Sequence, residues 1–219
     1  MNLITLDFET YYAQDFSLTK LTTEEYIRDP RFEVIGVGVK IDDAPTIWFS
    51  GERETIKSRL HSLIDWQNSA LLCHNTMFDG AILKWIFDCE PQFYLDTLCM
   101  ARAIHGVDAG GSLAKLAERY SIGVKGTEVV EAKGKRRTGF TNSELAQYGE
   151  YCKNDVELTL RLFQILSSEF PAEELDLIDM TLRMFICPTL GVNDALLEER
   201  LQEVRDEDRK STRLNSSHT

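Results

Sequence analysis

The stretch LITLDFET, residues 3–10, has the pattern of a β-strand but carries two carboxylates, Asp7 and Glu9, two residues apart. Successive side chains of a strand point to opposite faces, so residues i and i+2 share one face. Asp7 and Glu9 therefore stand side by side at the end of an apolar strand. Carboxylates that close repel and raise each other's pKa unless positive charge lies between them. The fold must therefore bring positive charge to this strand.

A third acidic residue, Asp155, interrupts the apolar face of a helix predicted over about 142–166. Apolar residues recur there at a spacing of three to four, which indicates a core-facing seam, and Asp155 occupies one of the seam positions. No Lys or Arg lies three or four residues away on this helix, so a buried Asp155 needs a partner from elsewhere. Tyr151 lies one turn earlier, on the same side as Asp155.

A fourth acidic residue, Asp79, lies in the first turn of a helix predicted over 78–87. It precedes by one turn the apolar face formed by Ile82, Leu83 and Ile86. One interpretation is helix capping, because the helix dipole favours an acidic residue near the N-terminus. The other is a role shared with the remaining carboxylates, and Asp79 alone does not decide between them.

Four carboxylates thus lie on faces that should be apolar, and burying them without compensation would cost many kcal/mol. A hard divalent cation, or a pair of them, removes that cost. Oxygen ligands favour Mg²⁺ or Mn²⁺, whereas zinc is disfavoured because the chain has no Cys and His set with ligand spacing. Two such ions, about 3.5–4 Å apart, form the clamp that catalyses in-line displacement at phosphorus. The carboxylates are Asp7, Glu9, Asp79 and Asp155.

Composition narrows the class of protein. The chain has 219 residues, 43% of them hydrophobic, which suits one globular domain of ordinary size. Its five cysteines are odd in number and form no CxxC pair, which is typical of reduced thiols in a cytosolic protein. A net charge of −12 argues against a general polyanion binder but not against a nucleic-acid enzyme whose acidic site is neutralised by metal ions. No apolar run approaches the roughly 18–20 residues that span a bilayer, and no signal segment precedes the first strand.

Apolar strands alternate with amphipathic helices in the first half of the chain, and the second half is mostly helical. This pattern predicts an α/β fold, with a mixed central sheet of about five strands and helices packed on it. Besides residues 3–10, strands are predicted at 32–40, 45–49, 70–74 and 93–96. Helices are predicted at 56–66, 78–87, 97–106, 111–120 and about 142–166, then from Pro171 and after Asp194, with a Gly-rich basic loop at 121–140.

Three motifs, taken together and in order, resemble those of the DEDD 3′–5′ exonucleases. They are LDFET with Asp7 and Glu9, HNTMFD ending at Asp79, and YCKND at 151–155. The histidine subtype would place His at position 150, which is Glu here, so Tyr151 identifies the tyrosine subtype. The resemblance implies a ribonuclease H-like fold and the activity of a metal-dependent exonuclease.

The sequence is also similar to those of phage and phage-like family A DNA polymerases, over about residues 1–208. The segment CPTLGVNDALLEERL, 187–201, resembles the stretch that leads from the exonuclease domain into the polymerase thumb. The resemblance implies an exonuclease domain at 1–168 and the helical start of a truncated thumb region at 169–209. The polar tail at 210–219 is predicted to be disordered and resembles translated sequencing-adapter sequence.

The resemblance assigns roles to the motif residues. Asp7, Glu9 and Asp155 would bind one of two divalent cations, Mg²⁺ or Mn²⁺, while Asp7 bridges to the second ion and Asp79 supports it. Tyr151 would position the attacking water. Contacts to the terminal nucleotide are expected from four residues, the first and last by stacking on the base: Phe8, Thr10, Asn75 and Phe78.

The leading hypothesis from the sequence is a 3′–5′ DNA exonuclease that proofreads beside a polymerase domain in cis, in a bacterial or phage-infected cytoplasm. Its partner would be a single-stranded DNA 3′ end, and no membrane is involved. A ribonuclease D-like RNA exonuclease with the same site is the alternative. A degenerate module that only binds single strands is a third, although it would not need all four carboxylates. The basic run KGKRRTG, 133–139, fits either a loop that grips phosphates or a solvated loop.

Overall fold

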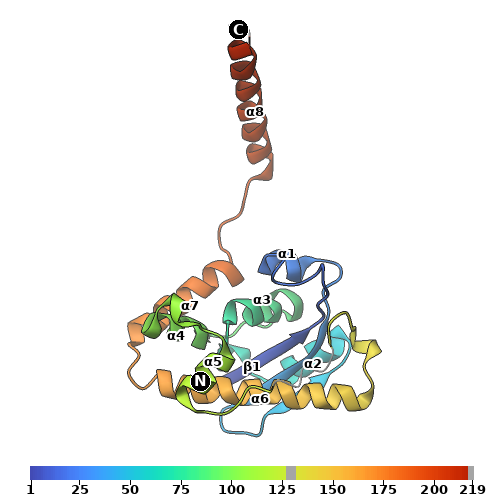
Figure 1. Ribbon diagram of the computed structural model, residues 1–219, viewed down its shortest axis with the longest axis vertical. Helices are drawn as coiled ribbons and strands as arrows, with labels where there is room; N and C mark the ends of the chain where they lie inside the picture. Colours follow the sequence, from blue (N-terminus) through green and yellow to red (C-terminus); the bar gives the residue numbers. More distant parts are fainter. Residues whose placement is uncertain (127–131, 217–219) are drawn as a thin grey trace. The chain divides into compact units, whose positions relative to one another are not determined.

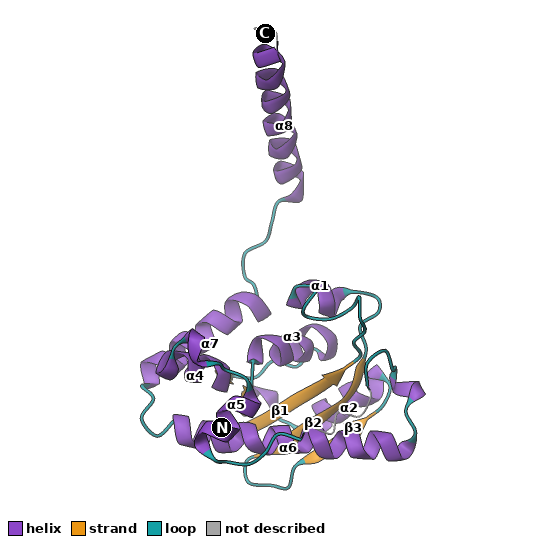
Figure 2. Ribbon diagram, viewed as in Figure 1, coloured by secondary structure: helices purple, strands orange, loops and turns teal. Residues whose placement is uncertain are grey.

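A computed structural model of the chain, which describes residues 1–126 and 132–216, has a five-stranded mixed sheet of order β3-β2-β1-β4-β5 (Figures 1 and 2). The central strand β1 is antiparallel to β2 and parallel to β4, while β3 pairs with β2 and β5 with β4. This confirms the predicted fold class. The strands are β1 (Asn2–Thr10), β2 (Val34–Ile41), β3 (Ile47–Ser50), β4 (Ser69–Cys73) and β5 (Phe93–Asp96).

The helices of the described residues lie between and after the strands along the chain. They are α1 (Thr23–Arg28), α2 (Arg53–Leu63), α3 (Thr76–Phe87), α4 (Thr97–His105), α5 (Leu113–Tyr120), α6 (Asn142–Leu166), α7 (Ala172–Ile186) and α8 (Asp194–Ser216). Short 3₁₀ turns lie at Trp66–Asn68, Val107–Ala109 and Arg137–Gly139. In the described part of the chain, no helix combines the length and the apolar character that crossing a bilayer requires.

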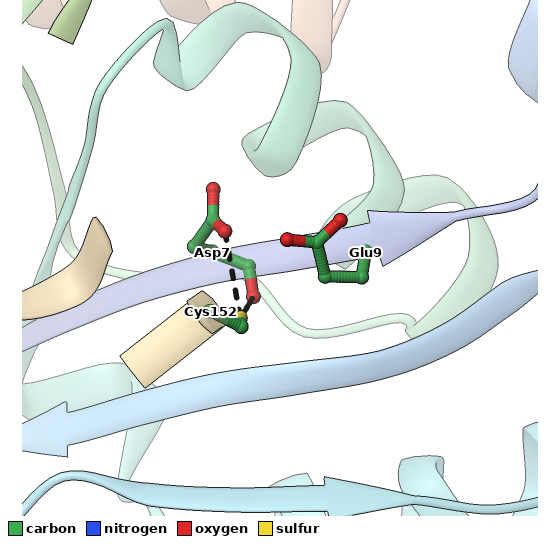
Figure 3. Close-up of side chains that lie close together, drawn as sticks. All are labelled: Asp7, Glu9 and Cys152. Atoms are coloured by element: carbon green, nitrogen blue, oxygen red, sulfur yellow. Dashed lines mark hydrogen bonds between the residues drawn. The ribbon is translucent and has the colours of Figure 1, made fainter. Parts of the chain in front are cut away.

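Alternation along β1 divides its side chains between the two faces of the sheet. Leu6 and Phe8 enter the large core shared with α2 and α3, where the Phe8 ring stacks on Phe87 at 5.4 Å between centroids. Asp7 and Glu9 point to the opposite face, which α6 covers (Figures 1 and 3). The sheet therefore carries an apolar core on one side of β1 and its acidic pair on the other.

Gly38 lets helix α6 approach the acidic end of β1 closely. It pairs with Asp7 across the β1–β2 ladder. A Cβ at this position would lie 2.9 Å from Cys152 Sγ and 3.1 Å from Val156 Cγ2, both on α6. Any side chain here would push α6, and with it Asp155, away from β1.

We expect Gly38→Ala to reduce the free energy of unfolding by about 1–3 kcal/mol, because the added methyl overpacks the α6 contact. Urea denaturation measures this loss. Gly191→Ala is the matched control, since no atom lies within 4 Å of the Cβ it would add. Equal stability of the two variants would show that α6 does not depend on this close approach.

The compact unit that contains the sheet runs from Met1 to Cys187, while the end of the exonuclease domain at residue 168 stays a prediction. Helix α7 belongs to it because Leu182 and Ile186 are buried in the same core as Phe8. The second unit begins at Pro188 and contains α8.

Two further differences concern helices. The sequence analysis did not predict α1, although its Thr22–Glu25 capping box is a recognised start signal. Helix α8 continues to Ser216, where an irregular tail was predicted from residue 210. Extending an existing helix adds one hydrogen bond per residue at little cost, and Lys and Arg favour it. The predicted disorder at 217–219 lies outside the described residues.

Candidate active site

Three elements bring the four carboxylates together at the end of β1. Asp7 and Glu9 project from the same face of β1, and Figure 3 shows their carboxylates side by side with Cys152 of α6 below them. Ligand atoms of these three residues all lie within 4.8 Å of one another. Asp79 comes from the first turn of α3 and Asp155 from the middle of α6. The negative charge of Asp155 raises the pKa of Asp7 and of Glu9, and the charges of Asp7 and Glu9 raise the pKa of Asp79, so all four acids share one electrostatic environment.

The Asp79 side chain bonds the backbone of β1 and does not cap its own helix. Its side chain is 3% exposed, and Oδ1 accepts a hydrogen bond of 3.0 Å from the backbone N–H of Phe8. This bond fixes the carboxylate beside Asp7 and Glu9. The structure therefore favours the shared role over the helix-capping interpretation.

Asp155 is 4% exposed and pairs with Lys125, whose Nζ lies 2.6 Å from Oδ2. The other carboxylate oxygen, Oδ1, is buried and has no hydrogen-bond partner among the residues that the structure describes. Leaving such an oxygen unpaired costs free energy, so its position marks a place for a ligand. Tyr151, one turn earlier on α6, hydrogen-bonds Asp155 through its hydroxyl, as the i to i+4 spacing predicted.

Burial and mutual repulsion raise the pKa of every carboxyl group in the cluster. Burial, followed by the charge of Asp155, raises the pKa of Asp7 to about 7. Burial and the charge of Asp7 raise that of Glu9 to about 8, and they hold the pKa of Asp79 well above its usual range. Burial also raises the pKa of Asp155, against the opposing effects of Lys125 and Tyr151. Without added cations, the cluster holds protons into the neutral range.

These residues fit divalent cations. The donor set is made of carboxylate oxygens, which suit Mg²⁺ and Mn²⁺, and the orphaned Oδ1 of Asp155 supplies a free ligand atom. Protons that the cluster holds because of repulsion would be displaced by ions of higher charge. Asp7, Glu9, Asp79 and Asp155 would hold the metal.

The comparison with protein families gives the class. The family model described as 3′–5′ exonuclease matches residues 3–171, and this range contains all four carboxylates and Tyr151. The chain belongs to the 3′–5′ exonuclease family. No curated protein matches it.

Solved structures resemble this exonuclease in fold. Trypanosoma brucei RNase D in complex with RNA U12 superposes with a TM-score of 0.65 at 15% identity, covering 87% of this chain and 65% of that one. Brucella melitensis NrnC with bound Mg²⁺ gives 0.58 at 14% identity, covering 85% and 82%. Escherichia coli RNase D gives 0.55 at 18% identity, covering 83% and 45%. At these identities the likeness establishes the ribonuclease H-like exonuclease fold, and the chain spans about two thirds or less of the RNase D proteins.

Sequence reasoning missed three residues that touch the carboxylates of the exonuclease. The Tyr148 hydroxyl hydrogen-bonds Glu9. Cys152 is fully buried, and its Sγ donates to Asp7 at 3.4 Å (Figure 3). Lys125 pairs with Asp155. Tyr148 and Cys152 were assigned to the apolar seam of α6, although their spacing from Tyr151 and Asp155 places them on the helix side that faces β1.

We expect Tyr148→Phe to lower exonuclease activity about tenfold or more, because outer partners of metal-binding groups usually matter on this scale. The ring stays stacked on Phe140, whose centroid lies 5.6 Å away, while Glu9 loses a donor. Initial rates of 3′ trimming measure the effect. Tyr120→Phe, a tyrosine that hydrogen-bonds His105 elsewhere, is the control and should retain the wild-type rate. A full rate in Tyr148→Phe would mean that Glu9 does not need this donor.

The structure contradicts one of the four predicted nucleotide contacts and leaves the other three as predictions. Phe8 is 5% exposed and stacks on Phe87 in the core, so the prediction that its ring stacks on a base is wrong. Alternation along β1 already placed it opposite Asp7 and Glu9, and its contribution is the N–H that holds Asp79. Phe78 is half-buried beside Tyr26, and Thr10 bonds the hydroxyl of Tyr26 at 3.0 Å.

Asn75 is exposed in the left-handed conformation, with φ 77°, directly before α3. The roles proposed for Thr10, Asn75 and Phe78 stay predictions. Asp96 is the N-cap of α4, where its carboxylate accepts the backbone N–H of Leu98, and it also accepts the backbone N–H of Thr76. His74 is satisfied by Thr97 and Gly111.

The described part of the basic segment is largely neutralised by acids of the fold. Lys135 pairs with Glu144, Arg136 with Glu33 and Arg137 with Glu52. These pairs leave fewer charges for phosphates than a free basic loop would offer, although Lys133 of the same run is exposed, so the phosphate-gripping role stays a prediction. Residues 127–131 of the predicted loop at 121–140 lie outside the described residues.

Proposed function

We propose that this chain is a divalent-metal-dependent exonuclease that removes nucleotides one at a time from the 3′ ends of RNA. The observation that carries the proposal is the convergence of Asp7, Glu9, Asp79 and Asp155 from three elements on one place. The match of the 3′–5′ exonuclease family model to residues 3–171 supports the reaction class.

In this proposal the residues of the chain divide the work. The four carboxylates would hold the ions. When bound, the ions would lower the pKa of a coordinated water and stabilise the negative charge that develops on the phosphate. The Tyr151 hydroxyl lies on the α6 side of the site beside Asp155, where it can orient the attacking water. Tyrosine itself is a poor base, because its pKa is raised above its usual value by burial and by Asp155.

RNA is favoured as the substrate by the solved neighbours. RNase D from Trypanosoma brucei is described in complex with RNA U12, and Brucella melitensis NrnC is described bound to pGG. These neighbours favour the ribonuclease D-like alternative of the sequence analysis over DNA proofreading.

A DNA 3′ end is the second candidate, with a polymerase domain in cis as its partner. The specific observation in its favour is the segment 187–201, which resembles the passage from exonuclease to polymerase thumb. In this case the primer terminus would be the natural substrate and the acidic exonuclease unit would depend on the polymerase for affinity.

The test uses 5′-labelled RNA and DNA oligonucleotides of identical sequence, incubated with the protein and Mg²⁺, with and without EDTA. We expect a ladder that shortens from the 3′ end, 5′-monophosphate products, no reaction with EDTA and faster shortening of RNA. Faster shortening of DNA would favour the second candidate. Binding without shortening of either strand would support a degenerate single-strand-binding module instead.

A further inference from the structure

A lysine occupies the acidic cluster where the proposed function places metal. The Lys125 ammonium lies 2.6 Å from Asp155 Oδ2, and its side chain is only 30% exposed. It also lies 5.4 Å from the centre of the Tyr151 ring. Its charge lowers the pKa of Asp7 and Glu9 as well as that of Asp155, so it acts on three of the four carboxylates.

Helix α6 itself holds the segment that delivers this lysine. Arg161 donates to the carbonyl of Ile122 at 3.0 Å, and Asn154 donates to the carbonyl of Val124 at 3.2 Å. These donors lie seven residues apart, two turns along one side of α6. The segment therefore follows the helix towards Tyr151 and Asp155, and the lysine is placed by two specific hydrogen bonds.

Gly126, the next residue, packs against Tyr151. A Cβ there would lie 3.3 Å from the ring. The backbone on both sides of Lys125 is thus fitted to α6, which makes the ion pair a built contact of the active site.

Charge balance makes the lysine and the metal alternatives. Four ionised carboxylates carry four negative charges, which two divalent cations neutralise completely. One lysine neutralises a single charge, so it cannot replace both ions, and the remaining charge of the cluster is left to protons or to metal. Once both ions are bound, the lysine has no unbalanced charge left to pair with, and a cation on Asp155 Oδ1 repels an ammonium that stays 2.6 Å from Oδ2 of the same carboxylate.

We propose that Lys125 is a built-in counter-cation that competes with the catalytic metal for Asp155. It stabilises the metal-free fold and weakens metal binding, so that occupancy of the site depends on displacing it. This inference rests on the proposed metal site and adds a residue that sets its affinity.

The experiment measures Mn²⁺ binding by electron paramagnetic resonance at pH 7.5, in wild type, Lys125→Met, Lys125→Arg and the control Lys133→Met, whose lysine is exposed. We expect Lys125→Met to tighten the Mn²⁺ dissociation constant about tenfold, which corresponds to about 1.4 kcal/mol. Lys125→Arg keeps the charge and should stay close to wild type, as should Lys133→Met. Thermal unfolding is the second readout: metal-free Lys125→Met should melt lower than wild type, and saturating Mn²⁺ should remove the difference.

The outcomes separate this inference from the function it rests on. If wild type binds Mn²⁺ and Lys125→Met binds it equally or more weakly, the competition is refuted while the metal site stands. A raised KM for RNA with unchanged Mn²⁺ affinity would assign Lys125 to substrate phosphate and refute the competition in the same way. If neither protein binds Mn²⁺, the metal site itself fails and the inference fails with it. Lys125→Gln is a second neutral variant should Lys125→Met not fold.

Discussion

Asp155→Asn is expected to abolish 3′ trimming, with a loss of about 1,000-fold or more, equivalent to about 4 kcal/mol of barrier. Asparagine keeps the size of the side chain but removes the negative charge that a divalent cation requires. It also breaks the ion pair with Lys125, while β1 and α6 keep their packing. Asp7→Ala should lose activity to the same extent, because Asp7 lies beside Glu9 and its charge raises the pKa of both Glu9 and Asp79.

Initial rates on a labelled RNA with Mg²⁺ measure this loss, and circular dichroism shows that the variants fold. Asp43→Asn, which changes an exposed aspartate in the turn after β2, is the matched control and should keep the wild-type rate. Tyr151→Phe gives an internal scale, since removing a hydroxyl that orients water should be milder than removing a metal ligand. Retained activity in Asp7→Ala would contradict the assignment of the site, and an equal loss in Tyr151→Phe would contradict the role given to Tyr151.

Local pattern was enough to find three of the four carboxylates, because each of these breaks a rule of its own element. Asp7 and Glu9 interrupt a strand with period two, and Asp155 interrupts a helix with period 3.6, so burial of charge could be inferred before any contact was known. The same alternation could have excluded Phe8 from base stacking, since it lies between the two acids. The Thr22–Glu25 capping box could likewise have predicted α1.

Contacts between distant segments could not be inferred in this way. Lys125 is 30 residues from Asp155 and comes from a segment with no regular structure, so nothing in its neighbourhood marks it as the partner. Tyr148 fits an apolar seam as well as it fits a polar contact, because its ring packs on Phe140 while its hydroxyl reaches Glu9. The membership of α7 in the first unit depends on which side chains it buries, which the helical pattern alone does not specify.

The stability of the metal-free protein should fall as the pH rises from 5 to 8.5. The pKa values of Asp7 and Glu9 are near their ordinary values of 3.8 and 4.5 in the unfolded chain, but burial and repulsion raise them to about 7 and about 8 in the folded protein. Between these limits the unfolded chain has lost its protons while the folded chain still binds them. The folded state therefore loses relative stability with each step of pH, and the loss continues through the folded pKa of Glu9, about 8. Each unit of upward shift in a pKa corresponds to about 1.4 kcal/mol.

Divalent metal should reverse this trend, because it binds the ionised carboxylates and stabilises the folded state in proportion to its occupancy. Thermal unfolding in EDTA and in Mg²⁺ at several pH values measures the difference in the free energy of unfolding between the metal-free and the metal-bound protein. This difference should widen by a few kcal/mol between pH 5 and 8.5. Asp7→Asn removes one of the groups whose pKa is raised and relieves repulsion on Glu9 and Asp79, so its metal-free melting temperature at pH 8 should exceed that of wild type, with a flatter pH profile. The exposed Asp43→Asn variant should follow the wild-type curve. If Asp7→Asn melted at the wild-type temperature at every pH, repulsion among the carboxylates would not destabilise the metal-free protein. The raised pKa values of Asp7 and Glu9 would then be contradicted.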